Sequence, residues 1–183
     1  VFFSACKCCY FDAATMLMEN SAALTIDFNA KDNKCRTAFH WACVRGHFNV
    51  AKMLMENSAT LSIDLYAIDF SGQTTFHLTC AYGHFDVAKM LMENSTTLSI
   101  DLNAKDEKGR TAFHLACGRG HANVAKMLME KSATLSIDLN AKDNAGQTAY
   151  NFGLMSGSNS TVALMQSNEE TLNINLGPKN NKP

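Results

Sequence analysis

Apolar residues recur along this chain with a helical period, and the pattern is clearest between residues 107 and 143. From about His121 to Lys131 they lie three and four positions apart, at Val124, Met127 and Leu128. That spacing places them on one face of a helix. The pattern therefore predicts a helix whose apolar stripe is buried against a neighbour.

A shorter helix is predicted immediately before this one, from about Thr111 to Arg119. Thr111 is suited to the N-cap position, because its hydroxyl can accept a backbone N–H of the first turn. Gly120 is suited to the left-handed residue that ends a helix. Asp106–Gly109, just upstream, has the composition of a tight turn.

The stretch from Ser132 to Lys142 has a different pattern, with apolar residues alternating at Leu135, Ile137 and Leu139. Alternation is typical of an extended segment with one buried side. The predicted order is therefore turn, helix, helix and extended return.

The whole pattern repeats every 37 residues. Thr37-Ala38-Phe39-His40 returns at 74–77 and 111–114, and more weakly at 148–151. Segments 33–69 and 107–143 are identical at 29 of 37 positions without a gap. A unit this small cannot bury its own apolar face, so successive units must stack. We expect one domain over 1–183, built from units 1–32 (truncated), 33–69, 70–106, 107–143 and 144–183 (degenerate and cap-like).

The repeat resembles the ankyrin repeat. The family pattern of Asp, Gly, Thr, His, Ala, Gly, His, Val and Leu is matched in order by Asp106, Gly109, Thr111, His114, Ala116, Gly120, His121, Val124 and Leu128. The resemblance covers the chain and implies an all-α solenoid of stacked helix-turn-helix units with β-turn or hairpin fingers.

Two departures from the family pattern affect the expected structure. The unit is four residues longer than the family's, which has about 33. The extra residues fall after the second helix, in 57–66 and its equivalents, where they either extend that helix or enlarge the loop. Cys35 and Cys9 replace the turn glycine and the inter-helix glycine, and both positions should be strained because a left-handed backbone favours glycine.

Composition narrows the possible functions. Lys and Arg number 16 against 17 Asp and Glu, for a net charge of −1. We therefore expect no nucleic-acid partner, since phosphate binding needs a basic excess. No apolar run approaches the length of a membrane span, so we expect no membrane insertion. The N-terminus lacks both an initiator Met and the basic region of a signal peptide. We therefore expect either a processed product or a piece cut from a longer chain. We also expect a cytoplasmic monomer.

Histidine and cysteine are the candidates for chemistry, but most of them follow the repeat. The resemblance implies that His40, His77 and His114 bond the preceding Thr, and that His47, His84 and His121 bridge to the adjacent turn. Cys6, Cys43, Cys80 and Cys117 share one register, where the family has a small buried residue. Burial in a reduced state is expected there.

A structural role is also favoured over metal binding or catalysis for the remaining cysteines and for a possible His–Cys catalytic pair. Cys8 and Cys9 together with Cys6 could form half of a zinc site, but no second ligand pair accompanies them. The His40–Cys43 spacing recurs in three units, whereas a nucleophile needs a single oriented site. We expect no enzyme activity, no cofactor and no metal. Any redox role for Cys8, Cys9 and Cys35 stays open.

Positions that vary between units are the candidates for partner binding. The resemblance implies that the turn tips and the ends of the first helices line a concave groove that binds other proteins. Aromatic and Arg residues dominate interface hot spots, and the candidates are Arg36, Arg45, Tyr66, Ile68, Phe70, Tyr82, Arg110 and Arg119. A partner with an aromatic or aliphatic anchor and some acidic character would suit them. Alternatively, Tyr66, Ile68 and Phe70 pack on one another. Trp41, in the register of Leu78 and Leu115, is expected in the core or in the packing between repeats.

Two functional hypotheses follow. The first is a non-catalytic module or scaffold that binds another protein or peptide. The alternative is a structural or spacer segment of a larger multidomain, channel or toxin-like polypeptide.

Overall fold

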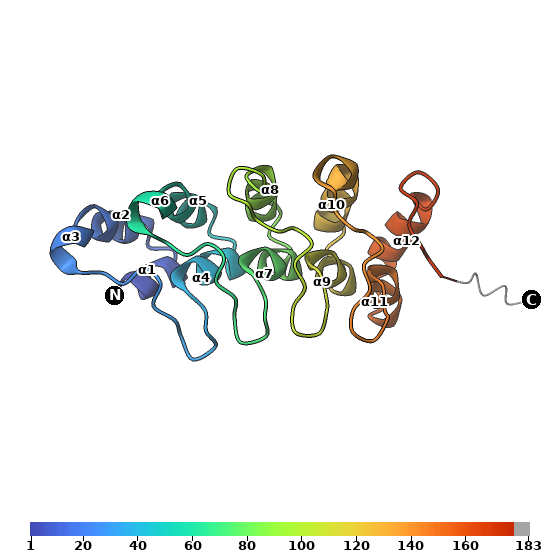
Figure 1. Ribbon diagram of the computed structural model, residues 1–183, viewed down its shortest axis with the longest axis horizontal. Helices are drawn as coiled ribbons and strands as arrows, with labels where there is room; N and C mark the ends of the chain where they lie inside the picture. Colours follow the sequence, from blue (N-terminus) through green and yellow to red (C-terminus); the bar gives the residue numbers. More distant parts are fainter. Residues whose placement is uncertain (178–183) are drawn as a thin grey trace, which may run out of the picture. The chain divides into compact units, whose positions relative to one another are not determined.

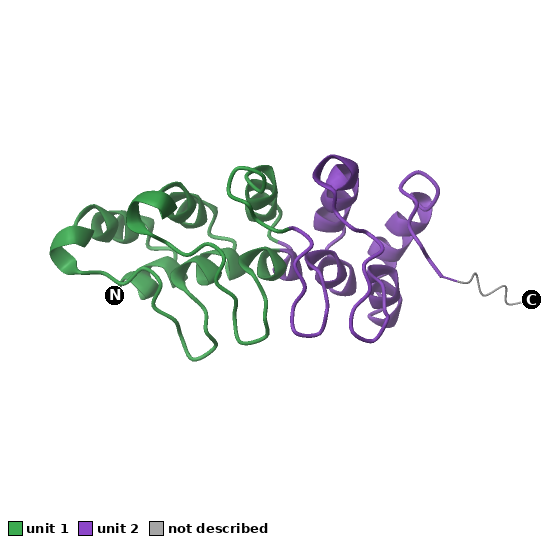
Figure 2. Cartoon of the chain, viewed as in Figure 1, with its two compact units in different colours: residues 1–79, 84–101 green, residues 80–83, 102–183 purple. Residues whose placement is uncertain are grey.

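The structure is a computed structural model that describes residues 1–177, and this part of the chain contains helices and turns but no strand (Figure 1). It confirms the predicted all-α fold class of helix-turn-helix units. The last six residues of the expected unit 144–183 lie outside the described residues. The chain divides into two compact units, residues 1–79 with 84–101 and residues 80–83 with 102–183 (Figure 2). A single domain over residues 1–183 stays a prediction.

Each compact unit is built from helix pairs. In the first unit, α1 packs on α4, α2 on α5, and α5 on α8. The helices that lie wholly in this unit are α1 Phe2–Lys7, α2 Phe11–Glu19, α3 Ser21–Leu24, α4 Ala38–Val44, α5 Phe48–Glu56, α6 Ser58–Leu61 and α8 Phe85–Glu93.

In the second unit, α9 packs on α11, and α10 on α12. Its complete helices are α9 Ala112–Gly118, α10 Ala122–Leu135, α11 Ala149–Met155 and α12 Asn159–Ser167. Helix α7, Thr75–Tyr82, contributes its first five residues to the first unit and its last three to the second.

The first helix of a repeat begins at a threonine, as predicted. Thr111 is the N-cap of α9, and together with His114 it forms a capping box in which each side chain satisfies a backbone N–H of the other residue. Gly120 follows the helix with φ +76°, the left-handed conformation expected of it.

The extra residues after the second helix are helical in three repeats, at α3, α6 and the end of α10, and form turns after α8 and α12. Helix α10 continues to Leu135 and ends at Ser136, whose φ is 53°. In the first unit, α5 is followed by the single helical turn α6, which ends at Ser62 with φ 51°. The prediction of an extended segment from Ser132 was therefore wrong up to Leu135, because this stretch continues the hydrogen bonding of the helix.

The predicted alternation holds after the helix ends. Ile137 and Leu139 are both buried. The largest fully buried side chains of the second unit are Phe113, Leu128, Met129 and Met165, and those of the first unit include Phe39, Phe76, Leu54, Leu91 and Met92. Burying an apolar side chain of this size contributes roughly 1.5–3 kcal/mol to stability. The repeat therefore places its apolar stripe in the core.

Asparagine side chains link successive repeats on the return segments. The Asn103 amide donates to the carbonyl oxygen of Ser136 at 2.8 Å and its oxygen accepts the backbone N–H of Asp138 at 2.8 Å. Asn29 holds Ser62 and Asp64 in the same way. Tyr66 occupies the same register in the intervening repeat. Its hydroxyl bonds the carbonyl oxygen of Leu98, in place of the pair of asparagine bonds.

Candidate functional site

An aspartate shapes the finger that leads into each first helix. Oδ1 of Asp32 accepts the backbone N–H groups of Lys34 and Arg36, at 2.8 and 2.9 Å. Asp69, Asp106 and Asp143 accept the equivalent two N–H groups in their own fingers. The aspartate of each finger therefore fixes the backbone of that finger. The residues at the tip of the finger are held at defined positions as a result.

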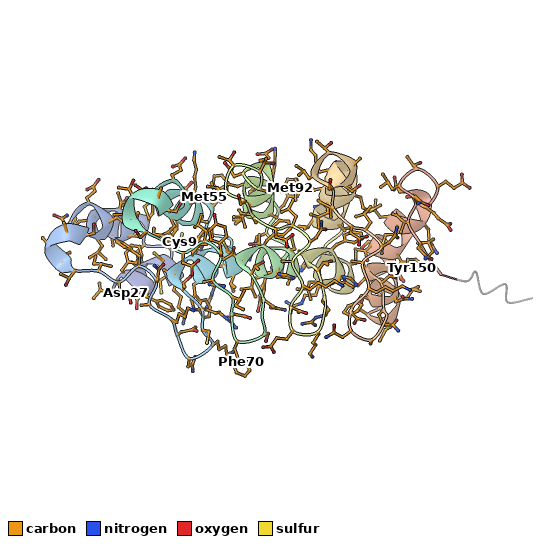
Figure 3. The ribbon with its side chains drawn as sticks, in the orientation of Figure 1. Cys9, Asp27, Met55, Phe70, Met92 and Tyr150 are labelled. Atoms are coloured by element: carbon orange, nitrogen blue, oxygen red, sulfur yellow. The ribbon has the colours of Figure 1, made fainter. Side chains whose placement is uncertain are left out.

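The arm that leads into the finger at Asp69 carries an apolar strip on its solvent side. Burial alternates along it, so that Tyr66, Ile68 and Phe70 are 57, 51 and 73% exposed, while Ala67 and Asp69 are buried. Phe70 lies at the tip of the finger (Figure 3). The Tyr66 hydroxyl donates to the carbonyl oxygen of Leu98. Each of the three apolar side chains thus keeps at least half of its surface exposed. The alternative that they pack on one another stays a prediction.

A tryptophan surrounded by cations lies on α4 in the same compact unit. The Lys7 ammonium is 4.3 Å from the centroid of the Trp41 ring, and the guanidinium carbons of Arg36 and Arg45 are 5.1 and 5.6 Å away. Each distance is within the range of a cation–π interaction. Trp41 is half-buried and lies outside the core. Its contact with Lys7 of the preceding repeat agrees with the other prediction for this residue, which was packing between repeats.

The polar partners of this cluster hold it in place. Trp41 Nε1 donates to Asp32 Oδ2 at 2.9 Å, and Arg36 Nε lies 3.7 Å from Asp69 Oδ2. Partial burial opposes ionisation of Asp32, but hydrogen bonds from the Arg36 backbone and the Trp41 indole outweigh it and lower the pKa of that carboxyl. Three cations and two carboxylates leave the cluster with a positive excess.

The sequence interpretation missed Trp41 as part of a surface cluster. The available signal was a lone tryptophan in a leucine register, with Lys7 and Arg45 both placed at the ends of first helices. The apolar character of Trp41 by itself indicated a core position. The sequence pattern could not show that Lys7 lies over the ring, because Lys7 belongs to the preceding repeat.

The second compact unit carries a smaller aromatic–cation pair. The guanidinium carbon of Arg119 is 5.0 Å from the centroid of the Tyr82 ring, and Nη1 donates to the carbonyl oxygen of Ala81 at 3.2 Å. Tyr82 is 44% exposed. Arg110 instead donates from Nε and Nη2 to Oδ2 of its own Asp106, at 2.9 and 2.6 Å, so its guanidinium is held within its own finger.

Comparison with family models decides the family. A model described as "Ankyrin repeats (3 copies)" matches residues 2–106, which is more than half of the chain, and one described as "Ankyrin repeats (many copies)" matches residues 94–152. The chain belongs to the ankyrin repeat family. Ankyrin repeats are generally protein–protein interaction modules, and the family is typically non-catalytic. A search of curated proteins finds no match.

The ankyrin histidines occupy two structural roles. Nδ1 of His40 lies 3.0 Å from the Thr37 hydroxyl, inside the capping box of α4. Nε2 of His84 lies 2.7 Å from the carbonyl oxygen of Val44, one repeat earlier. Burial lowers the pKa of His40 to about 4. One set of imidazoles therefore caps the first helices, and the other bonds the backbone of the preceding repeat.

The cysteine register of the ankyrin repeats is buried. Burial raises the pKa of the Cys6 and Cys43 thiols to about 12, and it also raises the pKa of Cys80 and Cys117. A buried thiol that stays protonated is a poor nucleophile and a poor metal ligand. The exposed thiols Cys8, Cys9 and Cys35 are free.

Residues 1–177 also bear on two other types of feature, a metal site and a membrane-spanning helix. Within this part of the ankyrin chain, no three His, Cys, Asp or Glu side chains are grouped closely enough to hold a metal ion. None of its helices combines the length and the apolar character needed to cross a membrane.

Proposed function

We propose that this ankyrin chain is a non-catalytic protein-interaction module that binds a protein or peptide through its finger arms and first-helix ends. The observation that carries the proposal is the exposed strip formed by Tyr66, Ile68 and Phe70. The sibling arm has Asn103, Lys105 and Glu107 at these positions. The fold accepts polar residues there, so the scaffold itself does not require the apolar ones.

The nature of the strip supports protein binding. A contiguous group of exposed apolar side chains is typical of an interaction site, and aromatic residues carry much of the binding energy in protein interfaces. The exposed residues stand on a finger that Asp69 orders from within. A partner with an aliphatic or aromatic anchor would therefore meet a surface that is already organised.

Charge supports a partner with some acidic character. In the first compact unit, Lys7, Arg36 and Arg45 surround Trp41, and in the second, Arg119 lies over Tyr82. Arg110 is less suited to contact a partner, because two bonds hold its guanidinium to Asp106. We rank Phe70, Tyr82, Arg45 and Arg119 above Arg110 as contact residues.

Alanine substitution tests the proposal on a partner captured from the source cell. Phe70→Ala, Tyr82→Ala and Arg119→Ala should each weaken binding, measured by isothermal titration calorimetry, by tenfold or more, since hot-spot truncations typically cost about 2 kcal/mol. Asn33→Ala is the matched control, because Asn33 takes the position of Phe70 in the preceding finger. Affinity unchanged in all three variants would exclude these residues as the site.

A structural or spacer role in a larger polypeptide is the alternative. The near-identity of the repeats and the asparagine links between return segments favour it. The triple variant Tyr66→Asn, Ile68→Lys and Phe70→Glu gives the arm the residues of its sibling. A spacer would leave the function of the parent polypeptide unchanged by this substitution, whereas a binding module would lose its partner.

Localisation and oligomeric state belong to the same proposal. Seven free thiols suit a reducing compartment, so we propose a cytoplasmic protein. We also propose a monomer, which sedimentation equilibrium would test at the concentrations used for calorimetry.

A further inference from the structure

The finger aspartates differ in how their second carboxylate oxygen is satisfied. In three of the fingers, Oδ2 has a hydrogen-bond or ion-pair partner in this chain. The pairs are Asp32 with Trp41 Nε1 at 2.9 Å, Asp69 with Arg36 Nε at 3.7 Å, and Asp106 with Arg110 Nη2 at 2.6 Å.

The fourth finger lacks such a donor. Oδ1 of Asp143 accepts the N–H groups of Ala145 and Gln147, at 2.9 and 2.8 Å. Within residues 1–177, no hydrogen bond or ion pair is made by Oδ2. Gln147 stands in the register of Arg110, as Gln73 does in the finger at Asp69. Asp69 is reached by Arg36 of the preceding repeat, whereas the counterpart of that residue, Arg110, is bonded to Asp106. The finger therefore has the carboxylate of its siblings without the cation.

The unpaired carboxylate borders an apolar groove in the second compact unit. This groove has a volume of about 380 Å³, and its lining includes Asp143, Gly118, Phe152 and Met155. Met155 is 78% exposed. A Cβ atom at position 118 would lie 3.1 Å from Phe152 Cδ1, so the glycine lets the aromatic ring pack closer than the valine or alanine of other repeats would allow.

We propose that this groove binds an arginine side chain of a protein partner. The guanidinium would bond to Asp143 Oδ2, and the aliphatic stem would lie against Phe152 and Met155. The proposal rests on the proposed function only in assuming a protein partner. It assigns a further subsite, of opposite charge preference to the Trp41 cluster.

The chemistry of the groove favours arginine over other side chains. A planar guanidinium bonds a carboxylate and stacks on an aromatic face, whereas an ammonium group acts as a point charge. The chain uses this arrangement itself, because Arg110 donates to Asp106 in the equivalent finger. An arginine of the partner would donate to Asp143 Oδ2 in the way that Arg110 of this chain donates to Asp106 Oδ2.

Titration with a short peptide tests the subsite directly. The probe is acetyl-Gly-Arg-Gly-amide, added to the 15N-labelled full chain and followed by NMR. One side chain in one groove should bind with a Kd on the order of millimolar. The amide shifts should concentrate at Gly118, Ala145 and Gln147. The norleucine peptide, which has the apolar stem without the charge, should bind at least about fivefold more weakly.

Two variants make the test specific. Asp143→Asn keeps an oxygen for the turn N–H groups but removes the charge, so it should weaken the arginine peptide by about fivefold. Gln147→Arg places the Arg110 residue type beside Asp143 and should abolish binding by satisfying Oδ2 from within. Because Gln147→Arg adds a bond that the sibling finger already contains, it keeps the test valid if Asp143→Asn fails to fold.

The outcomes separate this inference from the proposed function. Equal binding of the arginine and norleucine peptides, unchanged binding by Gln147→Arg, or no shift up to tens of millimolar peptide would overturn the arginine subsite. None of these results affects the loss of partner binding expected for Phe70→Ala. Conversely, a partner indifferent to Phe70, Tyr82 and Arg119 would leave the peptide titration at Asp143 unchanged.

Discussion

His40 Nδ1 lies 3.0 Å from the hydroxyl oxygen of Thr37 and also accepts the backbone N–H of Thr37 at 3.2 Å. Both residues are buried, and together they cap α4. The ring accepts this N–H only while Nδ1 is unprotonated. A capping interaction of the scaffold is thereby linked to pH.

Stability should therefore fall as the pH is lowered between about 6.5 and 4. Burial lowers the pKa of His40 from 6.5 to about 4, so the unfolded chain binds a proton more readily across this window. The contribution of neutral His40 to the free energy of unfolding is complete above pH 6.5 and is lost as the pH falls. At pH 5 the loss should be about 2 kcal/mol from His40 alone. Urea unfolding at several pH values measures it.

The last repeat supplies the control. Asn151 caps α11 through Thr148 with no titrating group, so His40→Asn should keep the cap. The pH dependence between 6.5 and 4 should become flatter in this variant, whatever its stability at neutral pH. An identical slope in the two proteins would show that His40 does not carry the effect.

Tyr66→Asn should stabilise the protein. The amide would restore the two links that Asn29 and Asn103 make to the next return segment, while the Tyr66 bond to Leu98 would be lost. One hydrogen bond gained overall is worth about 1 kcal/mol. Chemical denaturation measures the change, and Asn103→Ala should shift the midpoint in the opposite direction. A lower midpoint for Tyr66→Asn would mean that the tyrosine is the better link.

Cys35→Gly should also stabilise the protein. Cys35 has φ 59°, whereas Gly72, Gly109 and Gly146 occupy the same register with φ between 70 and 75°. A non-glycine residue in this conformation costs roughly 1–2 kcal/mol, part of which the greater unfolded-chain entropy of glycine offsets. We expect a net gain of about 1 kcal/mol in thermal or urea unfolding. Gly72→Ala is the reverse substitution and should lower stability by at least as much.

Trp41→Phe should raise the pKa of Asp32. The indole N–H is one of the donors that hold the pKa of this carboxyl below its ordinary value, and phenylalanine keeps a ring without that donor. The ionised form of Asp32 stabilises the fold above the ordinary carboxyl pKa, and this contribution is lost as the pH falls through the lowered value. Carboxyl 13C NMR titration should show the upward shift. An unchanged Asp32 titration would assign the effect to the backbone donors alone.

Much of the repeat could be predicted from the sequence because its determinants are local. The Thr111 cap, the left-handed Gly120 and the helix stripe at Val124 depend on residues within a few positions of one another. The strain expected at Cys9 and Cys35 is also local, and both residues have φ near 60°. Tandem repetition then made the family recognisable, since each local signal recurs every 37 residues.

The surface clusters depended on the tertiary structure because their members come from different repeats. Lys7 and Arg36 meet at Trp41 only when α1 packs on α4. The sequence placed Arg110 among exposed contact residues, but rotamer and finger geometry direct its guanidinium to Asp106.

Features determined by the sequence and features determined by the tertiary structure differ in the range of the interactions that set them. The sequence by itself determined the repeat, its caps and the family, because backbone conformation follows from neighbouring residues and a repeated apolar stripe. Only the tertiary structure decided that α10 continues to Leu135, that Phe70 is exposed and that Asp143 lacks a cation. Each of these depends on which atoms packing brings within bonding distance, and a linear pattern does not contain that information.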